Sequence, residues 1–509
     1  MTKTPRILLL RKKLTKYQER GVKMNFLRIA QISQVKSSDL IEHNAHFLFK
    51  RFRLSSILRQ CGIGKEKGHP IVFMFYLMLI VMLKGSRSLF SGIASLHATR
   101  LKSPLNSMLN NEFYNWRNLL YRISLRFAKL CPTPEGKTSA LIIDDTAKEK
   151  TGRRVENSSW FVDHCRKVYY MGYQAIVAAW HNGVVSIPLD FELKIGKARV
   201  KHANKSHYCK GTHTEQRQRM ARQKKTKIAE SFIRRAIQRG FRFRYLLWDS
   251  WYNNSGSLRF VFGTLRSKGI DLVAMVKRDG QRYLFGDKFM TIKELYRKSG
   301  KWQQKKATGI MYKSTVVAIL DKQSANQPES QTVLGNVRMC FFKYPQHKRY
   351  KALICTDMNL EEMEILSIYL RRWSIEVVFK ELKQYFGYDQ SKSSKYAPQI
   401  ADLTIRCIFY NMFCSLKYDY PSKSTGQLLI EFYSEMEDTW LDIFCSLVFT
   451  NKAKCLLEYA LSLGYSDVAQ LLNDYDLVLR QFMDRHWYDN EIEEMDKSIF
   501  ALKGYRNVS

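Results

Sequence analysis

Three acidic residues have the type and the neighbours expected of a site that cleaves phosphodiesters with metal ions. Asp145 ends the short apolar run 140–145, Asp249 follows the apolar run 243–248, and Glu376 lies in a long segment with helical periodicity. Phosphodiester hydrolysis needs an activated water, in-line geometry and neutralisation of developing charge, which two cations about 3.5–4 Å apart supply. Hard cations prefer oxygen ligands. The pattern therefore predicts a carboxylate triad that only folding brings together.

A line of polar residues surrounds the glutamate. Tyr369, Arg372, Glu376 and Lys383 lie at offsets of 0, 3, 7 and 14 within the predicted helix 359–387. At roughly 100° per residue, these four side chains fall within an arc of about 60° on one helical face. Apolar residues flank the line on both sides. The pattern is therefore a narrow charged line and not a broad solvated face.

The spacing of this line leaves two interpretations open. The line is either part of an active site or a ladder of ion pairs, in which Arg372, Glu376 and Lys380 are related by i,i+4 spacing. Periodicity does not separate the two, because both need charged residues on one face.

The same residues carry a family resemblance. Tyr-x2-Arg-x3-Glu-x6-Lys, read from Tyr369 to Lys383, resembles the signature of a large family of bacterial insertion-sequence transposases of the DDE superfamily. Asp145-Thr146 is similar to the first acidic motif of that family, and Asp249-Ser-Trp-Tyr252 is similar to its second. The similarity covers roughly residues 138–390, and the residues on either side carry no motif that can be transferred.

The resemblance implies a set of site residues and a cofactor. The residues implied to be catalytic and to hold the metal are Asp145, Asp249 and Glu376. The residues implied to bind DNA, through phosphates of the strand being cut, are Tyr369, Arg372 and Lys383. The implied cofactor is Mg²⁺, expected as two ions, for which Mn²⁺ can substitute.

The implied function is that of a DNA transposase. It would bind the terminal inverted repeats of its insertion sequence as a homodimer, cleave the ends, and transfer the 3′-hydroxyl ends into target DNA. Two alternatives stay open. One is a nuclease with the same triad but without strand transfer, and the other is a non-catalytic DNA-binding protein.

The first acid has two candidates, because Asp144 and Asp145 end the same apolar run. Successive residues of a strand point to opposite faces of the sheet, so we expect only one of them to face the metals. We predict Asp145, because it precedes Thr146 as the first acid does in similar transposases. Asp144 would then be a supporting or helix-capping carboxylate.

The charge balance indicates a polyanionic partner. The chain has 84 Lys and Arg against 46 Asp and Glu, a net charge of +38, and a pI near 9.8. Basic surfaces gain affinity for nucleic acids by releasing counterions from phosphates, although a generally basic proteome would give the same balance. Residues 217–227 include six Lys or Arg, which predicts a segment that follows the DNA backbone or, alternatively, a solvated basic helix face.

The order of predicted elements indicates an α/β fold with a ribonuclease-H-like catalytic core. The first Asp-bearing strand is followed by a hairpin of strands 169–180 and 184–193, whose Asn182-Gly183 turn favours a tight reversal. A basic helix, 215–239, leads to the strand that precedes Asp249, and a further strand covers 270–276. A 13% aromatic content supports packed cores and argues against disorder.

The chain is predicted to have three regions. Residues 1–131 form a helical DNA-binding domain, in which Ser103-Pro104 begins a helix that runs through residues 110–117. Residues 132–394 form the catalytic domain, with a β-rich insertion at about 282–356. Residues 395–509 form a helical C-terminal domain that is a candidate for dimerisation.

The sequence also predicts where the protein works. The longest apolar run, 71–83, is too short to span a bilayer and is predicted to be a buried helix. Ten scattered cysteines without a CxxC pair are typical of a reduced compartment. We therefore expect a bacterial, cytoplasmic, nucleoid-associated protein with no membrane partner.

Overall fold

The computed structural model describes residues 45–64, 71–83, 102–163, 166–277, 281–321, 332–347 and 349–431. The described residues from Phe49 onward belong to one compact unit, to which the rest of this description applies, and residues 45–48 belong to another. The predicted domain boundaries at residues 131 and 394 stay predictions. The predicted C-terminal helices beyond residue 431 lie outside the described residues.

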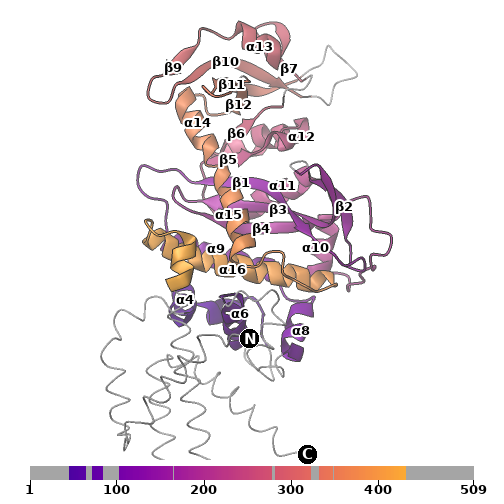
Figure 1. Ribbon diagram of the computed structural model, residues 1–509. Helices are drawn as coiled ribbons and strands as arrows, with labels where there is room; N and C mark the ends of the chain where they lie inside the picture. The colour runs from indigo at the N-terminus through magenta and orange to yellow at the C-terminus, as the bar shows by residue number, and fades with distance from the viewer. Residues whose placement is uncertain are drawn as a thin grey trace, which may run out of the picture. The chain divides into compact units, whose positions relative to one another are not determined.

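The core is a mixed sheet in which five strands have the order β4-β3-β1-β5-β6 (Figure 1). β1, β5 and β6 are parallel to one another, and β3 is antiparallel to both β1 and β4. The five strands are β1 (Ala140–Glu149), β3 (Val168–His181), β4 (Ser186–Lys194), β5 (Tyr245–Trp248) and β6 (Asp271–Met275). This mixed α/β arrangement is consistent with the predicted ribonuclease-H-like core.

The predicted hairpin is confirmed, and its turn is held by one side chain. Asn182 Oδ1 accepts hydrogen bonds from the backbone N–H groups of Val184 and Val185, both at 2.9 Å. Gly183 has φ +95°, a backbone conformation that residues with a side chain rarely adopt. A short edge strand, β2 (Ser159–Asp163), pairs with the start of β3 and was not predicted.

The predicted helix 215–239 is two helices, α10 (His213–Ala221) and α11 (Lys225–Gln238). Thr212 caps the first by accepting from the N–H of Glu215. The first ends in a tight turn, where the N–H of Gln223 bonds to the carbonyl of Met220. The second ends as predicted at Gly240, which has φ +84°.

The N-terminal helices differ from the prediction at the Asn-rich segment. The helix after Ser103 stops at Asn110, because Asn111 accepts from the N–H of Phe113 in a local turn. Asn115 then caps a new helix by accepting from the N–H of Asn118. The helices here are α4 (Ala45–Phe52), α5 (Leu54–Gln60), α6 (Ile71–Leu83), α8 (Lys102–Asn110) and α9 (Trp116–Leu130).

The apolar run 71–83 is helix α6, as predicted, and most of its described side chains are buried. No helix among the described residues has both the length and the apolar character needed to cross a membrane.

The region 282–356 is rich in strands, as expected for the insertion. β12 pairs antiparallel with β6, so these strands continue the core sheet. Its elements are β7 (Arg282–Phe285), β8 (Lys288–Thr291), α13 (Ile292–Lys298), β9 (Gln303–Lys305), β10 (Ile310–Leu320), β11 (Val333–Lys343) and β12 (Lys351–Cys355). Between β5 and β6 lie short helical turns, namely η2 (Ser250–Tyr252), α12 (Ser255–Phe260), η3 (Val261–Leu265) and η4 (Arg266–Lys268).

The predicted helix 359–387 is shorter and interrupted. It begins at Glu362, because Glu361 and Glu364 form the capping box at its N-terminus. A turn of two residues, Arg371 and Arg372, separates its two halves, although both residues keep helical backbone angles. The halves are α14 (Glu362–Leu370) and α15 (Trp373–Gln384), and the buried helix α16 (Tyr396–Asp419) follows.

Two buried carboxylates on β4 tie the surrounding helices to the sheet. Asp190 is 1% exposed and accepts from the Nε atoms of Arg117 at 2.9 Å and Arg235 at 2.8 Å. Glu192 is fully buried and is paired with Arg117 and Arg217. Burial alone would raise the pKa of Asp190, but the three arginines hold it below its usual value. The network joins α9, α10 and α11 to one strand.

We expect Asp190→Asn to destabilise the protein by about 3–5 kcal/mol, because it leaves buried guanidinium groups without their counter-charge. Glu230→Gln, which breaks surface ion pairs to Lys227 and Arg234, should cost at most about 1 kcal/mol. Urea unfolding of both variants measures the difference. Equal losses of stability would show that the Asp190 network does not hold the helices in place.

Candidate active site

The strand register brings two acidic residues to neighbouring positions. Ile143 of β1 is the Cα partner of Trp248 in β5, so Asp144 and Asp249 follow at the next step of the parallel ladder. Asp249 directly follows β5 and precedes η2. Parallel α/β sheets place their sites at this carboxyl edge. The sequence predicted that this strand ends at Asp145. In the structure, β1 continues to Glu149 and stays paired with β3 over that length.

Alternate residues of β1 fix the position of helix α15. Three side chains on one face of the strand, and that of Lys150 just after the strand, bond to the segment from Arg372 to the loop after α15. The pairs are Asp144 with Arg372 Nη1 (2.6 Å), Thr146 Oγ1 with Lys383 Nζ (2.9 Å), Lys148 Nζ with the carbonyl of Tyr388, and Lys150 Nζ with the carbonyl of Ser391 (2.8 Å). This face of β1 therefore aligns α15 along the strand.

Arg372 links two of the acids. Its guanidinium donates to Asp144 through Nη1 at 2.6 Å and to Glu376 through Nη2 at 2.8 Å. The guanidinium carbon also lies 5.9 Å from the ring centre of Tyr369. The charged line predicted on the helix therefore contains an ion pair at i,i+4, as the ladder interpretation requires, and also faces an aspartate of β1, as the active-site interpretation requires.

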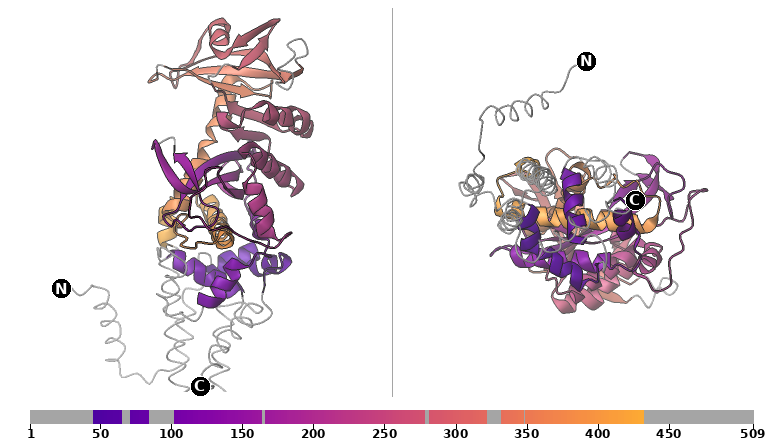
Figure 2. Two further views of the ribbon diagram at one scale, coloured as in Figure 1. Left: turned by 90° about the vertical axis from the view of Figure 1, so that its right-hand side faces the viewer. Right: turned by 90° about the horizontal axis from the view of Figure 1, so that it is seen from below.

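Asp145 points to other partners. It accepts from Lys225 Nζ of α11 at 3.1 Å, from the Tyr252 hydroxyl at 3.4 Å, and from the amide of Gln174. The exposed Trp251 packs under the same lysine, whose Nζ is 4.8 Å from the ring centre. Helices α15 and α11 lie on opposite sides of the sheet in the left view of Figure 2. Asp144 and Asp145 therefore face opposite sides, as strand geometry requires.

The half-buried carboxyl of Asp144 has a raised pKa. Burial raises its pKa to about 7 against the pull of Arg372, and the negative charges of Asp145 and Asp249 add to the rise. Burial likewise raises the pKa of the Tyr369 hydroxyl to about 12. A site with nearby carboxylates and too little positive charge favours cation binding.

The donor set suits a hard cation. Asp144, Asp249 and Glu376 offer only carboxylate oxygens, which Mg²⁺ prefers. Among the described residues, however, no three His, Cys, Asp or Glu side chains are already arranged as metal ligands. The guanidinium of Arg372 instead occupies the position between Asp144 and Glu376. A cation bridging these acids would have to replace that guanidinium.

Two features of the site were not predicted from the sequence. Lys225 and Gln174 contact Asp145, and the buried Lys148 and the half-buried Lys150 continue the contacts of β1. Residues 144–150 are all polar except Ala147, so no polar-apolar alternation there could have revealed the second feature. No local signal points to Gln174, because it reaches Asp145 only through the pairing of β3 with β1.

The predicted basic segment 217–227 does not form one continuous surface. Arg217 is buried and paired with Glu192, and Lys225 is bound to Asp145. Lys227 is exposed but pairs with Glu230. Of the six basic residues, Arg219, Arg222 and Lys224 are exposed without an ion pair to a described residue.

Comparison with known families agrees with this geometry. A family model described as DDE superfamily endonuclease matches residues 74–335, which is just over half of the chain. The match includes both candidates for the first acid and Asp249, and Glu376 lies beyond it. No curated protein matches the chain.

The raised pKa of Asp144 gives a pH-dependent prediction. The pKa of Asp144 is about 7 in the folded protein and 3.8 ordinarily. Between pH 4 and pH 7, the folded protein therefore keeps a proton on this carboxyl that the unfolded chain has already released. The contribution of Asp144 to stability should therefore fall as pH rises from about 4 to 7. In chelator-treated protein, we expect a carboxyl ¹³C signal, absent from Asp144→Asn, to titrate near pH 7. A midpoint near pH 4 would contradict this prediction.

Proposed function

Because the chain belongs to the DDE superfamily of endonucleases, a family that hydrolyses phosphodiester bonds in DNA, we propose that it is a DNA transposase of the bacterial insertion-sequence type. It binds the terminal inverted repeats of its element, cleaves the ends and transfers the 3′-hydroxyl ends into target DNA. The observation that carries the proposal is the link that Arg372 makes between Asp144 and Glu376, beside Asp249. Three acids in this setting suit metal-dependent phosphodiester chemistry.

DDE nucleases typically use divalent metal ions, and we propose two Mg²⁺ ions here, for which Mn²⁺ can substitute. When bound, such ions activate water and neutralise charge on the phosphate. Asp249 and Glu376 are proposed ligands. For the first acid, the motif favours Asp145, whereas the contact with Arg372 and the register with Asp249 favour Asp144. We assign the role to Asp144 and regard Asp145 as its rival.

Arg372 has two roles in this proposal. Without metal, its charge compensates Asp144 and Glu376. When cations take over that compensation, the planar guanidinium is free to bind two oxygens of a phosphate. Tyr369 and Lys383 lie on the same helical line and bind phosphates of the strand being cut. The same residues thus keep the acids in place before DNA binds and position the strand afterwards.

The proposed partner is duplex DNA, both as terminal repeats and as target, bound by a homodimer. The net charge of +38 supports a polyanionic substrate. A nuclease without strand transfer is the second candidate, because it would use the same acids. The family model describes an endonuclease and therefore fits both.

The identity of the first acid can be tested directly. We expect Asp144→Asn, Asp249→Asn and Glu376→Gln to reduce cleavage of end DNA by at least a hundredfold, because each keeps the shape but removes a metal-binding charge. Asp145→Asn should retain measurable cleavage. Nicking assays in Mg²⁺, beside gel-shift binding of the same DNA, separate catalysis from binding. If Asp145→Asn is inactive and Asp144→Asn is active, the motif is right and our assignment is wrong.

Strand transfer separates the two enzymatic candidates. We expect the protein to join pre-cut end duplexes with free 3′-hydroxyls to a supercoiled plasmid in Mg²⁺, because one set of ions can serve both water and a 3′-hydroxyl as nucleophile. Glu376→Gln serves as the inactive control. Cleavage of end DNA without any joined product would favour a nuclease.

A further inference from the structure

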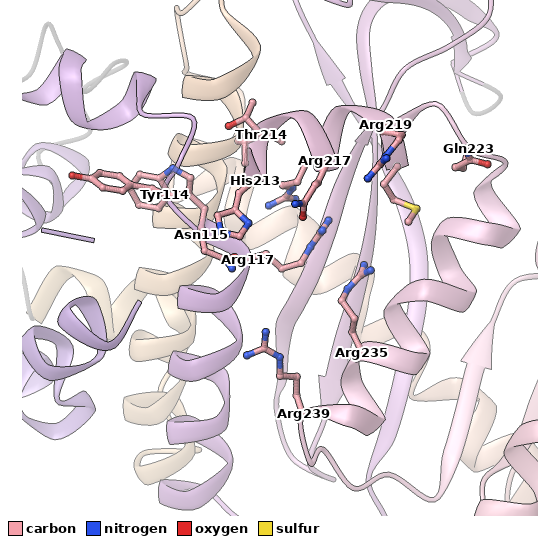
Figure 3. Close-up of a pocket in the computed structure, with 14 residues that line it drawn as sticks. Tyr114, Asn115, Arg117, His213, Thr214, Arg217, Arg219, Gln223, Arg235 and Arg239 are labelled. Atoms are coloured by element: carbon pink, nitrogen blue, oxygen red, sulfur yellow. The ribbon is translucent and has the colours of Figure 1, made fainter. Parts of the chain in front are cut away.

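A cavity of about 460 Å³ lies among helices α9, α10 and α11, and arginine side chains surround it (Figure 3). Five arginines from these helices and their ends line it, namely Arg117, Arg217, Arg219, Arg235 and Arg239. None of the three acids proposed for catalysis lines it. The cavity is therefore a separate feature of the fold.

The arginines outnumber the carboxylates that neutralise them. Among the carboxylates of the described residues, Arg117, Arg217 and Arg235 pair with Asp190 and Glu192. Among the described residues, neither of the other two arginines of the cavity is paired with a carboxylate, and Arg239 donates only to the amide oxygen of Asn118. The cavity thus carries excess positive charge.

Two buried donors of the cavity residues have no acceptor. The indole Nε1 of Trp116 and Nη2 of Arg235 are both buried without a hydrogen-bond partner in the described part of the chain. Leaving a buried donor unsatisfied is costly, so such atoms indicate a missing acceptor. Excess positive charge on the residues that line one cavity favours a ligand with several anionic oxygens. Phosphate matches the fork geometry of guanidinium groups.

The aromatic residues that line the cavity do not expose a ring face on which a base could stack. Trp116 is 2% exposed and Tyr114 is 8% exposed, and their rings pack edge-to-face with centres 5.8 Å apart. Their faces are therefore engaged in the protein core and do not present a platform for a base. The cavity would therefore bind the phosphate of a ligand and make no stacking contact with a base.

The chain path connects the cavity to Asp145, the neighbour of Asp144 that faces the α11 side of the sheet. Arg219 lines the cavity, and Lys225, six residues later, bonds to Asp145. Six residues span at most about 22 Å. The exposed Arg222 and Lys224 lie between them in sequence. A DNA duplex that binds at this end of β1 and contacts the α11 side of the sheet therefore has phosphates within reach of the cavity.

We propose that this arginine cavity binds a backbone phosphate of the DNA held at the active site, a few nucleotides from the cleaved bond. The phosphate completes the hydrogen bonding of the arginine cluster and anchors the duplex without reading its sequence. The choice of DNA as the source rests on the proposed function, whereas the phosphate site itself does not.

The test compares two pairs of substitutions with the same change in charge. Arg219→Gln with Arg239→Gln removes the two cavity arginines that lack a carboxylate, so the buried Asp190 network stays intact. Arg153→Gln with Arg154→Gln removes two exposed arginines that do not line the cavity. Binding of the full-length chain to a random-sequence duplex is measured from 50 to 300 mM salt, with unfolding curves as a check on folding.

We expect the cavity pair to reduce the slope of log K against log salt by about 0.9, the value for one lost phosphate contact. The control pair should reduce it by clearly less. Equal slopes in the two variant proteins would overturn the proposal, because net charge alone would then explain the binding.

A second measurement distinguishes DNA from a free anion. Inorganic pyrophosphate is titrated into the wild-type protein and the cavity variant by calorimetry. Competition between pyrophosphate and DNA, lost in the cavity variant, supports the proposal. Saturable pyrophosphate binding with no effect on DNA would overturn DNA as the source. Absence of cleavage by the wild-type protein would contradict the proposed function but would leave these binding results interpretable.

Discussion

The geometry around the candidate active site depends on the charge of one guanidinium between two carboxylates. Arg372 holds Glu376 of α15 against Asp144 of β1, and the parallel register then places Asp249 beside them. Burial raises the pKa of Asp144, the charge of Arg372 opposes that rise, and the charges of Asp145 and Asp249 add to it. The remaining bonds from β1 to the segment after Arg372 extend this contact along the strand. The helix is therefore fixed by electrostatics as well as by packing.

The sequence predicted the sheet better than it predicted which way the side chains face. The apolar runs before Asp145 and Asp249 are strands, and the Asn182-Gly183 turn is where it was expected. These features are encoded locally. Whether Asp144 or Asp145 faces α15 depends on the register of β1 with its neighbours, which no local pattern specifies. Gln174 was missed for the same reason.

Helix boundaries were predicted less well, and the errors share a cause. The helix expected to run past Asn110 stops there, because Asn111 and Asn115 bond to nearby backbone N–H groups. The helix expected at 215–239 is interrupted after Ala221, and its basic residues then separate into buried and exposed positions. Periodicity indicates that a helix is present, but side-chain bonds to the backbone decide where it ends. A basic run is accordingly a poor guide to a DNA-binding surface.

The central inference is that Arg372 occupies the place of the catalytic cations until they bind. A crystal structure of the protein with Mn²⁺ and end DNA, with anomalous scattering to locate the ions, tests this most directly. We expect an ion beside Asp144 and Glu376, with the Arg372 guanidinium moved from these carboxylates onto a DNA phosphate. An ion held by Asp145, with Arg372 still bonded to Asp144 and Glu376, would contradict it.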